Sequence, residues 1–558
     1  MLLLSARPVG VTGKPVYFAP VNRRRLLQSA AALALAPRPL LAVTPNLAPF
    51  RVLYSNDTTN ISGCVSPWHK AGEPFRTAML EASVDEVAGK VDAHFLQPGL
   101  GMVPMWPSKV LPLEPHYAWI KERYGVSPDS FGKYVLAGGD VVKVFIDRCR
   151  KTGQAPFISF RLNDAHHKEF AFPQPGDKPG TSMGMSVTRH YVEHPEFILK
   201  QGSKRAADVV QNWIHREVRA QKLALITELC ENYDLDGLEL DFMRFDSFFN
   251  QSETTLEQRC EIITGFVQQV RAVLDRTARY GRQRWLCARV PCLIKGLDSL
   301  GIDLTALVAS GLDMVNASAS YFTTQAMDLV PIRKRCEGAA LYVELCHSIE
   351  NGPKLTTGYD TFAFRRTTKE QLQTTAHLGY ARGAQGVSLF NFAYYRPHGG
   401  PGRGEFSEPP FDVLLSLGDA ALLARQPQHW FFAIGWNNAY QRPPLLPRKL
   451  TIGQKTLFHM DMAPPVGGWK SEGRLRVQCE EPLEGHALKV RFNGKELETN
   501  ENISEPFVNS NLTLLGTREQ MRAWKVPASL PLNGKNEIEV TLVSGEAVSV
   551  HYLDVKLQ

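Results

Sequence analysis

Short apolar runs of strand-forming residues alternate along most of the chain with longer segments of helical period. Eight of these runs are predicted strands, at residues 51–57, 91–99, 155–164, 235–245, 284–292, 313–321, 340–348 and 386–395. Strands that alternate with helices are joined by crossover connections and form parallel sheets. Eight such units in one domain predict an α/β fold of the (β/α)8 TIM barrel class. The alternative, an open doubly wound sheet, would normally have a glycine-rich loop after its first strand, and the segment YSNDTTNISG that begins at Tyr54 is not such a loop.

The predicted helices show apolar faces and capping signals. The helix at 255–275 places its apolar residues on one face, namely Leu256, Cys260, Ile263, Phe266, Val267, Val270, Val273 and Leu274. A second helix is expected to begin with a capping box of Thr367 and Glu370 and to end at Gly383. A third is predicted over residues 412–426. These helices are expected to cover the outside of the barrel, which is assigned to residues 43–430.

The pattern changes after the last helix. A proline-rich linker is predicted at residues 431–449, and residues 450–558 alternate apolar and polar positions with the period of strands. Asn493-Gly494, between two such runs, is a strong hairpin signal. A smaller all-β sandwich domain is therefore predicted after the barrel, either packed on the barrel or in contact with glycan.

Residues 1–42 resemble a twin-arginine export signal. An arginine cluster, Arg23–Arg25, precedes a modest apolar run and small residues suited to cleavage. The segment carries six positive charges and no acidic side chain, so the net charge of +7 would be +1 without it. The remainder is nearly neutral, which gives no electrostatic case for nucleic acid as a partner. We expect a periplasmic or extracellular protein without a membrane span in its mature form, and the oligomeric state stays open.

Cysteine and histidine patterns do not indicate a disulfide scaffold or a metal centre. The nine cysteines are an odd number, and none forms a CxxC pair. Asp, Glu and His at barrel strand ends can bind zinc or manganese, which keeps a metal-dependent hydrolase as a minor alternative. No metal and no cofactor is expected.

The fourth predicted strand carries the candidate chemistry. Because side chains alternate across a strand, Glu239 and Asp241 share one face, while Leu238, Leu240 and Phe242 share the other. The apolar face should contact the helices, so the acids should point to the barrel axis, with Asp241 nearer the carboxyl end of the strand. Barrel enzymes keep their active sites at that end.

Buried acids need partners, and other predicted strand ends supply them. Asp241 and Glu344, on the fourth and seventh strands, are the predicted catalytic pair, because glycosidic cleavage uses one carboxylic acid and one carboxylate. By analogy with retaining barrel glycosidases, Asp241 is the expected acid/base and Glu344 the expected nucleophile. The expected carbohydrate-binding residues are Arg161, Asn163, Asp164, His166, Glu239, Arg244, Asn316 and Asn391.

The segment YDLDGLELDFMRF, from Tyr233 to Phe245, resembles the DG(I/L)xxDxxRF pattern of the glycosyl hydrolase-like family 10 barrels of bacteria. The resemblance spans about residues 50–425 and includes the GAQGVSLFNF segment at the eighth strand. It implies a secreted (β/α)8 glycoside hydrolase that acts on a polysaccharide or glycoconjugate. Asp236, Asp241 and Arg244 match the motif itself, and Glu344 is chosen from its place on the seventh strand.

The same segment is partly similar to the DGxDxDWE strand of family 18 chitinases. Asp236, Glu239 and Asp241 fall on the three aspartates, but the final catalytic glutamate falls on Met243, which cannot give a proton. This departure argues against chitinase chemistry. The predicted function is therefore glycoside hydrolysis with a carboxylate pair, and the alternative is a carbohydrate-binding barrel without catalysis.

Overall fold

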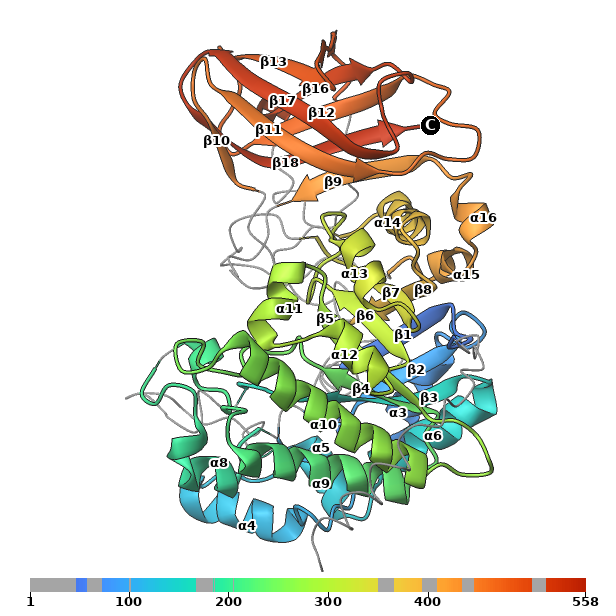
Figure 1. Cartoon of the computed structure of the whole chain (residues 1–558), viewed down its shortest axis with the longest axis vertical. Coiled ribbons are helices and arrows are strands. Elements are labelled where there is room, and N and C mark those ends of the chain that lie inside the picture. Colours follow the sequence, from blue (N-terminus) through green and yellow to red (C-terminus); the bar gives the residue numbers. More distant parts are fainter. Residues whose placement is uncertain are drawn as a thin grey trace, which may run out of the picture. The chain divides into compact units, whose positions relative to one another are not determined.

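The computed structural model describes residues 47–57, 73–99, 102–166, 184, 186–203, 205–349, 366–393, 409–433, 446–503 and 518–558. The predicted export signal at residues 1–42 lies outside these ranges. Eight parallel strands, β1 to β8, close into a barrel in sequence order (Figure 1). Two further antiparallel sheets follow toward the C-terminus. The prediction of a TIM barrel followed by a β-sandwich is confirmed.

All eight predicted runs contain a barrel strand. The strands are β1 Val52–Asp57, β2 Ala93–Gln97, β3 Ala155–Arg161, β4 Gly237–Asp241, β5 Trp285–Pro291, β6 Met314–Ser318, β7 Ala340–Leu345 and β8 Gly386–Phe390. Most are shorter than predicted because the last residues of several runs leave the sheet and enter the loops at the carboxyl end. Those residues include several of the polar groups expected in the site.

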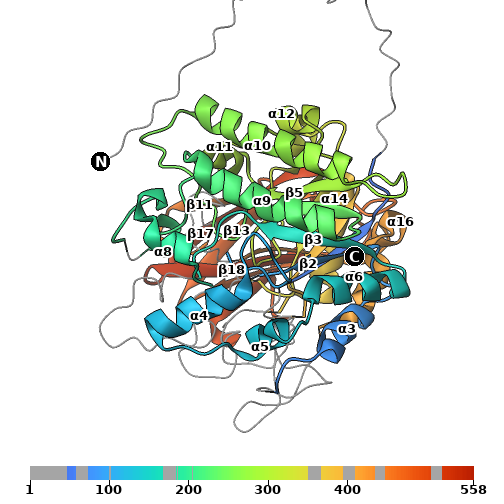
Figure 2. The same cartoon turned by 90° about the horizontal axis from the view of Figure 1, so that it is seen from below.

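Helices follow the strands around the outside of the barrel. They are α3 Thr77–Asp85, α4 Leu113–Tyr124, α5 Ser130–Leu136, α6 Val141–Thr152, α8 Arg189–Glu193, α9 Arg216–Asn232, α10 Leu256–Arg276, α11 Ile294–Leu300, α12 Leu304–Ala309, α13 Leu329–Arg335, α14 Lys369–Ala381, α15 Leu414–Leu417 and α16 Ala420–Leu423. The long helices α9 and α10 lie side by side (Figure 2). No helix among the described residues combines the length and the apolarity that a membrane crossing requires.

Two helix predictions need correction. The capping box of α14 is formed by Thr368 and Gln371, one residue later than the predicted pair. The predicted helix at 412–426 is divided into α15 and α16, because Asp419 caps a new helix by accepting a hydrogen bond from the N–H of Leu422. A good capping residue inside an apolar run therefore restarted the helix.

The amino-terminal half of the barrel interior is apolar. Phe95 and Phe157 stack with ring centroids 4.5 Å apart, and Met314 and Tyr342 belong to the same buried cluster. Gly237 makes room for this packing, since a Cβ atom there would lie 2.1 Å from the ring of Phe157. Polar side chains therefore collect toward the carboxyl end of the strands.

The C-terminal sheets form a sandwich. One sheet has the order β10-β18-β12-β16-β15, with β9 paired to β18, and the other has the order β11-β17-β13-β14. The strands are β9 Gln428–Ala433, β10 Arg448–Leu450, β11 Lys455–Met462, β12 Gly473–Cys479, β13 Ala487–Phe492, β14 Lys495–Glu496, β15 Thr499–Asn500, β16 Met521–Val526, β17 Gly534–Ser544 and β18 Val548–Leu557. Asn493 and Gly494 both have positive φ at the β13–β14 turn, as the Asn-Gly signal predicts.

Barrel helix α14 also contacts the C-terminal sheets. Gln371 donates to the hydroxyl of Tyr552 at 2.9 Å, and Arg382 binds the carboxylate of Asp461 at 2.6 Å. Strand β9 lies across the predicted boundary at residue 430, because it pairs along its whole length with β18. The sandwich thus packs on the barrel, which is one of the two roles expected for it.

Candidate active site

Strand β4 presents its acids to the barrel interior. Leu238, Leu240 and Phe242 belong to the apolar cluster between strands and helices. Because side chains alternate, Glu239 and Asp241 point to the opposite side, toward the axis. Hydrogen bonds from neighbouring strands to both carboxylates agree with this orientation.

Asp241 and Glu344 converge on one guanidinium, that of Arg289 on β5. Arg289 Nε donates to Glu344 Oε2 at 2.6 Å and Nη2 donates to Glu344 Oε1 at 2.8 Å. Its Nη1 donates to Asp241 Oδ1 at 3.1 Å. The structure therefore brings the two predicted catalytic carboxyl groups together at the carboxyl end of the strands. Burial would lower the pKa of Arg289, but the two carboxylates raise it.

Both carboxyl groups receive further hydrogen bonds. Asp241 accepts from the side chain of Gln97 at 3.2 Å and from the N–H of Met243 at 2.8 Å. Glu344 accepts from the hydroxyl of Ser318 and from the amide of Asn316. Asp241 is 0% and Glu344 is 2% exposed. Burial raises the pKa of Glu344 above its ordinary value, although Arg289 and Ser318 act in the opposite direction.

Glu239 lies deeper than this pair. Its Oε1 accepts from the hydroxyl of Ser159 at 2.7 Å, and its Oε2 accepts from the amide of Asn316 at 3.3 Å. Burial raises the pKa of Glu239 to about 7, and the negative charge of Asp241 adds to this effect, while Arg289 lowers it. Asn316 also donates to Glu344, so one amide joins the deep carboxyl group to the upper pair.

A second polar cluster, the mouth cluster, consists of Arg161, Asp164, His166 and Arg244. Asp164 accepts from Arg161 at 3.2 Å and from the Nδ1 of His166 at 2.6 Å. Arg244 donates to the Nε2 of His166 at 2.6 Å and lies over the ring of Tyr321, 5.0 Å from its centroid. Burial would raise the pKa of Asp164, but His166 and Arg161 outweigh it and hold the pKa well below its usual range.

Two members of the mouth cluster reach solvent, since the side chain of His166 is 31% exposed and Arg244 is half-buried. Tyr321, which lies against Arg244, is also half-buried. Arg161 also donates to Gln97 Oε1 at 2.8 Å, and Gln97 contacts Asp241. The mouth cluster and the carboxylate pair are therefore connected through Gln97.

Two further predicted binding residues, Asn163 and Asn391, are buried beyond the ends of β3 and β8. The amide of Asn163 donates to the carbonyls of Gln211 and Ser247 and accepts from the N–H of Gln211, so it joins two loops. Asn391 is buried after β8 with a positive φ of 48°, and its N–H donates to the carbonyl of Ser55. The contacts of Asn163 therefore indicate a structural role in joining the two loops.

The central residue that sequence reasoning missed is Arg289. It lies in the apolar run CARVPC, whose alternation places Cys287, Arg289 and Pro291 on one face. An arginine that faces the buried barrel axis requires hydrogen-bond acceptors, which carboxylates can supply. That requirement was the available signal, because acids were already expected on the axis.

No group of three or more His, Cys, Asp or Glu side chains within the described ranges has an arrangement suited to a metal ion. The carboxylates of the site instead bind guanidinium, amide and hydroxyl groups.

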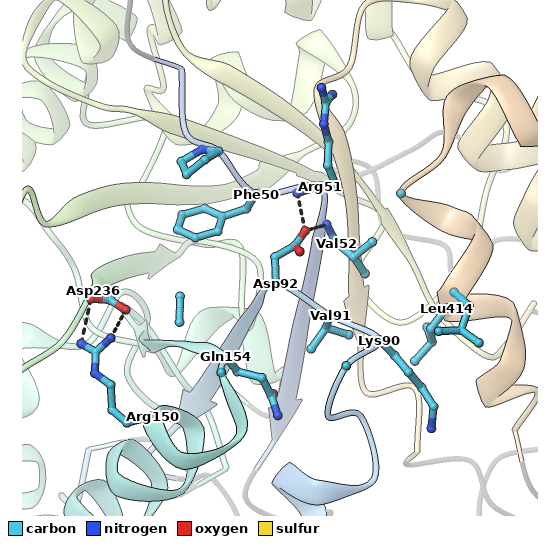
Figure 3. Close-up of a pocket in the computed structure, with 16 residues that line it drawn as sticks. Phe50, Arg51, Val52, Lys90, Val91, Asp92, Arg150, Gln154, Asp236 and Leu414 are labelled. Atoms are coloured by element: carbon cyan, nitrogen blue, oxygen red, sulfur yellow. Dashed lines mark hydrogen bonds and ion pairs between the residues drawn. The ribbon is translucent and has the colours of Figure 1, made fainter.

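A cavity of about 760 Å³ lies at the opposite, amino-terminal end of the strands (Figure 3). Its acids already have partners: Asp236 binds Arg150 at 2.7 Å, and Asp92 accepts from the N–H groups of Arg51 and Val52. These contacts fix the entrances of the strands, which gives Asp236 a structural role. The candidate site remains at the carboxyl end.

No family model matches the chain, and no curated protein matches it. Solved structures with a general likeness include alpha-L-fucosidase isoenzyme 1 from Paenibacillus thiaminolyticus, with 12% identity, 88% of this chain and 96% of that chain covered, and a TM-score of 0.33. A putative alpha-L-fucosidase from Bacteroides thetaiotaomicron has 12% identity, with 91% of this chain and 94% of that chain covered and a TM-score of 0.33. A noncanonic maltogenic alpha-amylase from Thermotoga neapolitana has 13% identity, with 87% of this chain and 98% of that chain covered and a TM-score of 0.35. At this identity and these TM-scores, the function of the chain has to come from its own site.

Proposed function

We propose that this protein is a glycoside hydrolase that cleaves glycosidic bonds with the carboxyl groups of Asp241 and Glu344. One observation carries the proposal: carboxyl groups from two different strands share one buried guanidinium at the carboxyl end of a closed barrel. This is the end at which barrel enzymes carry out their chemistry. Two carboxyl groups held close together are also what glycosidic cleavage requires.

In the proposed reaction, one carboxylic acid gives its proton to the glycosidic oxygen as the bond from that oxygen to the anomeric carbon breaks. The other carboxylate either attacks the anomeric carbon or takes a proton from a water molecule that attacks it. If a glycosyl ester forms, water then hydrolyses it, and the first group takes the proton of that water. The route through the glycosyl ester returns both groups to their starting protonation states. In the direct route the proton ends on the other carboxyl group and has to return to the acid by exchange with solvent before the next turnover.

The contacts of Asp241 and Glu344 with Arg289 bear on which of the two is the acid/base and which the nucleophile. Arg289 brings one positive charge to two carboxyl groups, so the pair can keep one proton without leaving a charge unbalanced. Arg289 donates to both oxygens of Glu344 and to one oxygen of Asp241, so Glu344 has the contacts of an ionised carboxylate. This supports the division expected by analogy, in which Asp241 is the acid/base and Glu344 the nucleophile. Azide rescue of the two alanine variants tests this division through the anomeric configuration of the product. In a retaining enzyme the acid/base variant should form the glycosyl azide of retained configuration, and the nucleophile variant that of inverted configuration.

The proposed substrate is a polysaccharide or glycoconjugate that enters past the mouth cluster. Arg161, His166 and Arg244 offer charged and polar groups there, and Tyr321 offers an aromatic face. The match of Asp236, Asp241 and Arg244 to the strand-four motif of the family 10 barrels supports the same substrate class. Export through the twin-arginine-like segment is part of this proposal. Fusion of residues 1–42 to a reporter, with Arg23 and Arg24 changed to lysine as control, tests it by cell fractionation.

The central test uses Asp241→Asn and Glu344→Gln on a panel of aryl glycosides and polysaccharides. Both variants should lose turnover by at least about 10³-fold and keep glycan binding. Asp236→Asn is the matched control, because Asp236 lies on the same segment but binds Arg150 and Arg282 at the other end of the strand. Binding without turnover by the parent protein would favour the carbohydrate-binding barrel. Loss of activity with chelator and its return with added metal would favour the metal-dependent alternative.

A further inference from the structure

Arg289 is held on several sides at once. Besides its three hydrogen bonds to Glu344 and Asp241, its Nη2 donates to the carbonyl of Ser320 at 3.0 Å. Its guanidinium lies 3.8 Å from the centroid of the Phe390 ring. Phe390 comes from β8, so β4, β5, β7 and β8 and the loop after β6 all meet at this one group. The guanidinium plane is fixed as a result.

A fixed guanidinium also fixes what it binds. Glu344 is held through both oxygens, a fork geometry that lysine cannot reproduce. Asp241 is held through one oxygen, while its other oxygen accepts from Gln97. The relative orientation of the two carboxyl groups therefore depends on one side chain that itself makes no contact with solvent, being 1% exposed.

The same side chain balances charge. Asp241, Glu344 and Glu239 meet within the barrel, and Arg289 is the cation that contacts two of them. Without that cation, buried carboxylates facing one another would take up protons, because like charges in a buried site cannot all stay ionised.

We propose that Arg289 is a positioning residue, which holds the carboxyl groups of Asp241 and Glu344 in a fixed relative orientation and stabilises the one that stays ionised. This inference rests on the proposed function for its catalytic consequence. Its electrostatic consequence does not depend on turnover and is tested separately.

The test compares Arg289→Lys and Arg289→Met in the full chain. Arg289→Lys keeps the charge but loses the fork, so kcat on the best aryl glycoside should fall at least about 10²-fold with KM changed less than about 3-fold. Arg289→Met loses both charge and fork. In infrared spectra in ²H₂O at neutral pH, this variant should show more protonated carboxyl groups than the parent, and Arg289→Lys should resemble the parent.

Arg284→Lys is the matched control. Arg284 is also buried, at 2% exposure, and precedes the same strand, but it binds the carbonyls of Cys230 and Tyr233 rather than acids. It should leave kcat and the carboxyl band unchanged. If Arg289→Met does not fold, as shown by circular dichroism, Arg289→Lys alone carries the kinetic test, and Arg289→Gln, close in size, replaces Met in the infrared test.

The outcomes separate the two proposals. Unchanged carboxyl protonation in the neutral variant, or full kcat in Arg289→Lys, overturns the positioning role. If the parent protein hydrolyses no glycan while Arg289→Met still shows more protonated carboxyl groups than the parent, the glycosidase function is overturned. That result supports the electrostatic role of Arg289. The expected kinetic and infrared changes together support both.

Discussion

Glu239 is a buried carboxyl group whose environment shifts its titration into the neutral pH range. Its pKa of about 7 in the folded protein lies above the ordinary 4.5, because burial and then Asp241 disfavour its ionised form. The folded state therefore binds this proton more tightly than the unfolded state. The contribution of Glu239 to the free energy of unfolding is fully present below about pH 4.5. It is lost as the pH rises through 7, and the total loss is about 3 kcal/mol.

Glu239→Gln should remove most of that pH dependence. The glutamine keeps nearly the same shape and can still accept from Ser159, but it cannot ionise. Thermal melts between pH 5 and pH 8 should show a shallower decrease of the midpoint for the variant than for the parent. Equal slopes for the two proteins would show that another group dominates, with Glu344 the next candidate because its pKa is also raised.

Gly237 gives a steric prediction at the same strand. An added Cβ would lie 2.1 Å from the Phe157 ring, so Gly237→Ala should lower the free energy of unfolding by about 2–3 kcal/mol through overpacking. Gly265→Ala is the opposite case, because no neighbouring atom lies within 4 Å and the residue is inside α10. It should gain up to about 1 kcal/mol. Urea unfolding of both variants checks the pair, and equal effects would contradict this account of the barrel interior.

At the level of elements, Glu228 on α9 fastens the connection between β2 and α4. It accepts from Trp106 Nε1 at 2.9 Å, from the Ser108 hydroxyl at 2.6 Å, and from the N–H groups of Lys109 and Val110. Glu228 is only 7% exposed, and its carboxylate accepts four hydrogen bonds from this loop. It therefore satisfies buried donors of the loop and fixes the loop's conformation. Helix α9 therefore orders the loop between β2 and α4.

Glu228→Ala should release that loop and destabilise it by about 2–3 kcal/mol, because its donors lose a buried acceptor. Hydrogen exchange at Lys109 and Val110 should accelerate, while exchange in β2 stays slow. Glu231→Ala on the same helix is the control, since Glu231 is 55% exposed and should change stability by less than about 0.5 kcal/mol. Equal exchange in the two variants would mean that the loop is held by other contacts.

The elements themselves were largely predictable, and the reasons are local. Period-two and helical patterns predicted all eight strands and most of the buried face of α10, although Leu256 at its start is 39% exposed, and Asn493-Gly494 predicted its turn. The division at Asp419 was not predicted, because a capping residue and a helical surface residue look alike in an apolar run.

The site was only partly predictable for a different physical reason. Alternation on β4 places Asp241 on the axis, and strand order brings Glu344 near it. Alternation in CARVPC could have placed Arg289 on the axis, but which acids it joins depends on the relative stagger of β4, β5 and β7, and the sequence contains no local signal for that register. For the same reason the partners of Glu239 could not be predicted: they are Ser159 and Asn316, and the nearby guanidinium is that of Arg289.

At the scale of the whole molecule, barrel and sandwich share a buried polar network. Asp554 on β18 accepts from Arg476 Nε at 2.8 Å and from His429 Nε2 at 2.7 Å, and all three side chains are at most 1% exposed. The N–H of His429 in turn donates to Thr374 on α14 at 2.8 Å. Burial would raise the pKa of Asp554, but Arg476 and His429 outweigh it and hold the pKa well below its usual range.

Asp554→Asn should therefore affect both parts of the molecule. It leaves the buried Arg476 without its carboxylate, and breaking a buried ion pair in this way typically costs about 3–5 kcal/mol. Because β9 and α14 carry the network into the barrel, hydrogen exchange should accelerate in α14 as well as in β18. Glu539→Gln is the control, since its partner Lys455 is 62% exposed and such surface pairs contribute about 1 kcal/mol or less. Faster exchange in β18 with unchanged exchange in α14 would mean that the sandwich unfolds by itself, and the barrel would then not depend on it for stability.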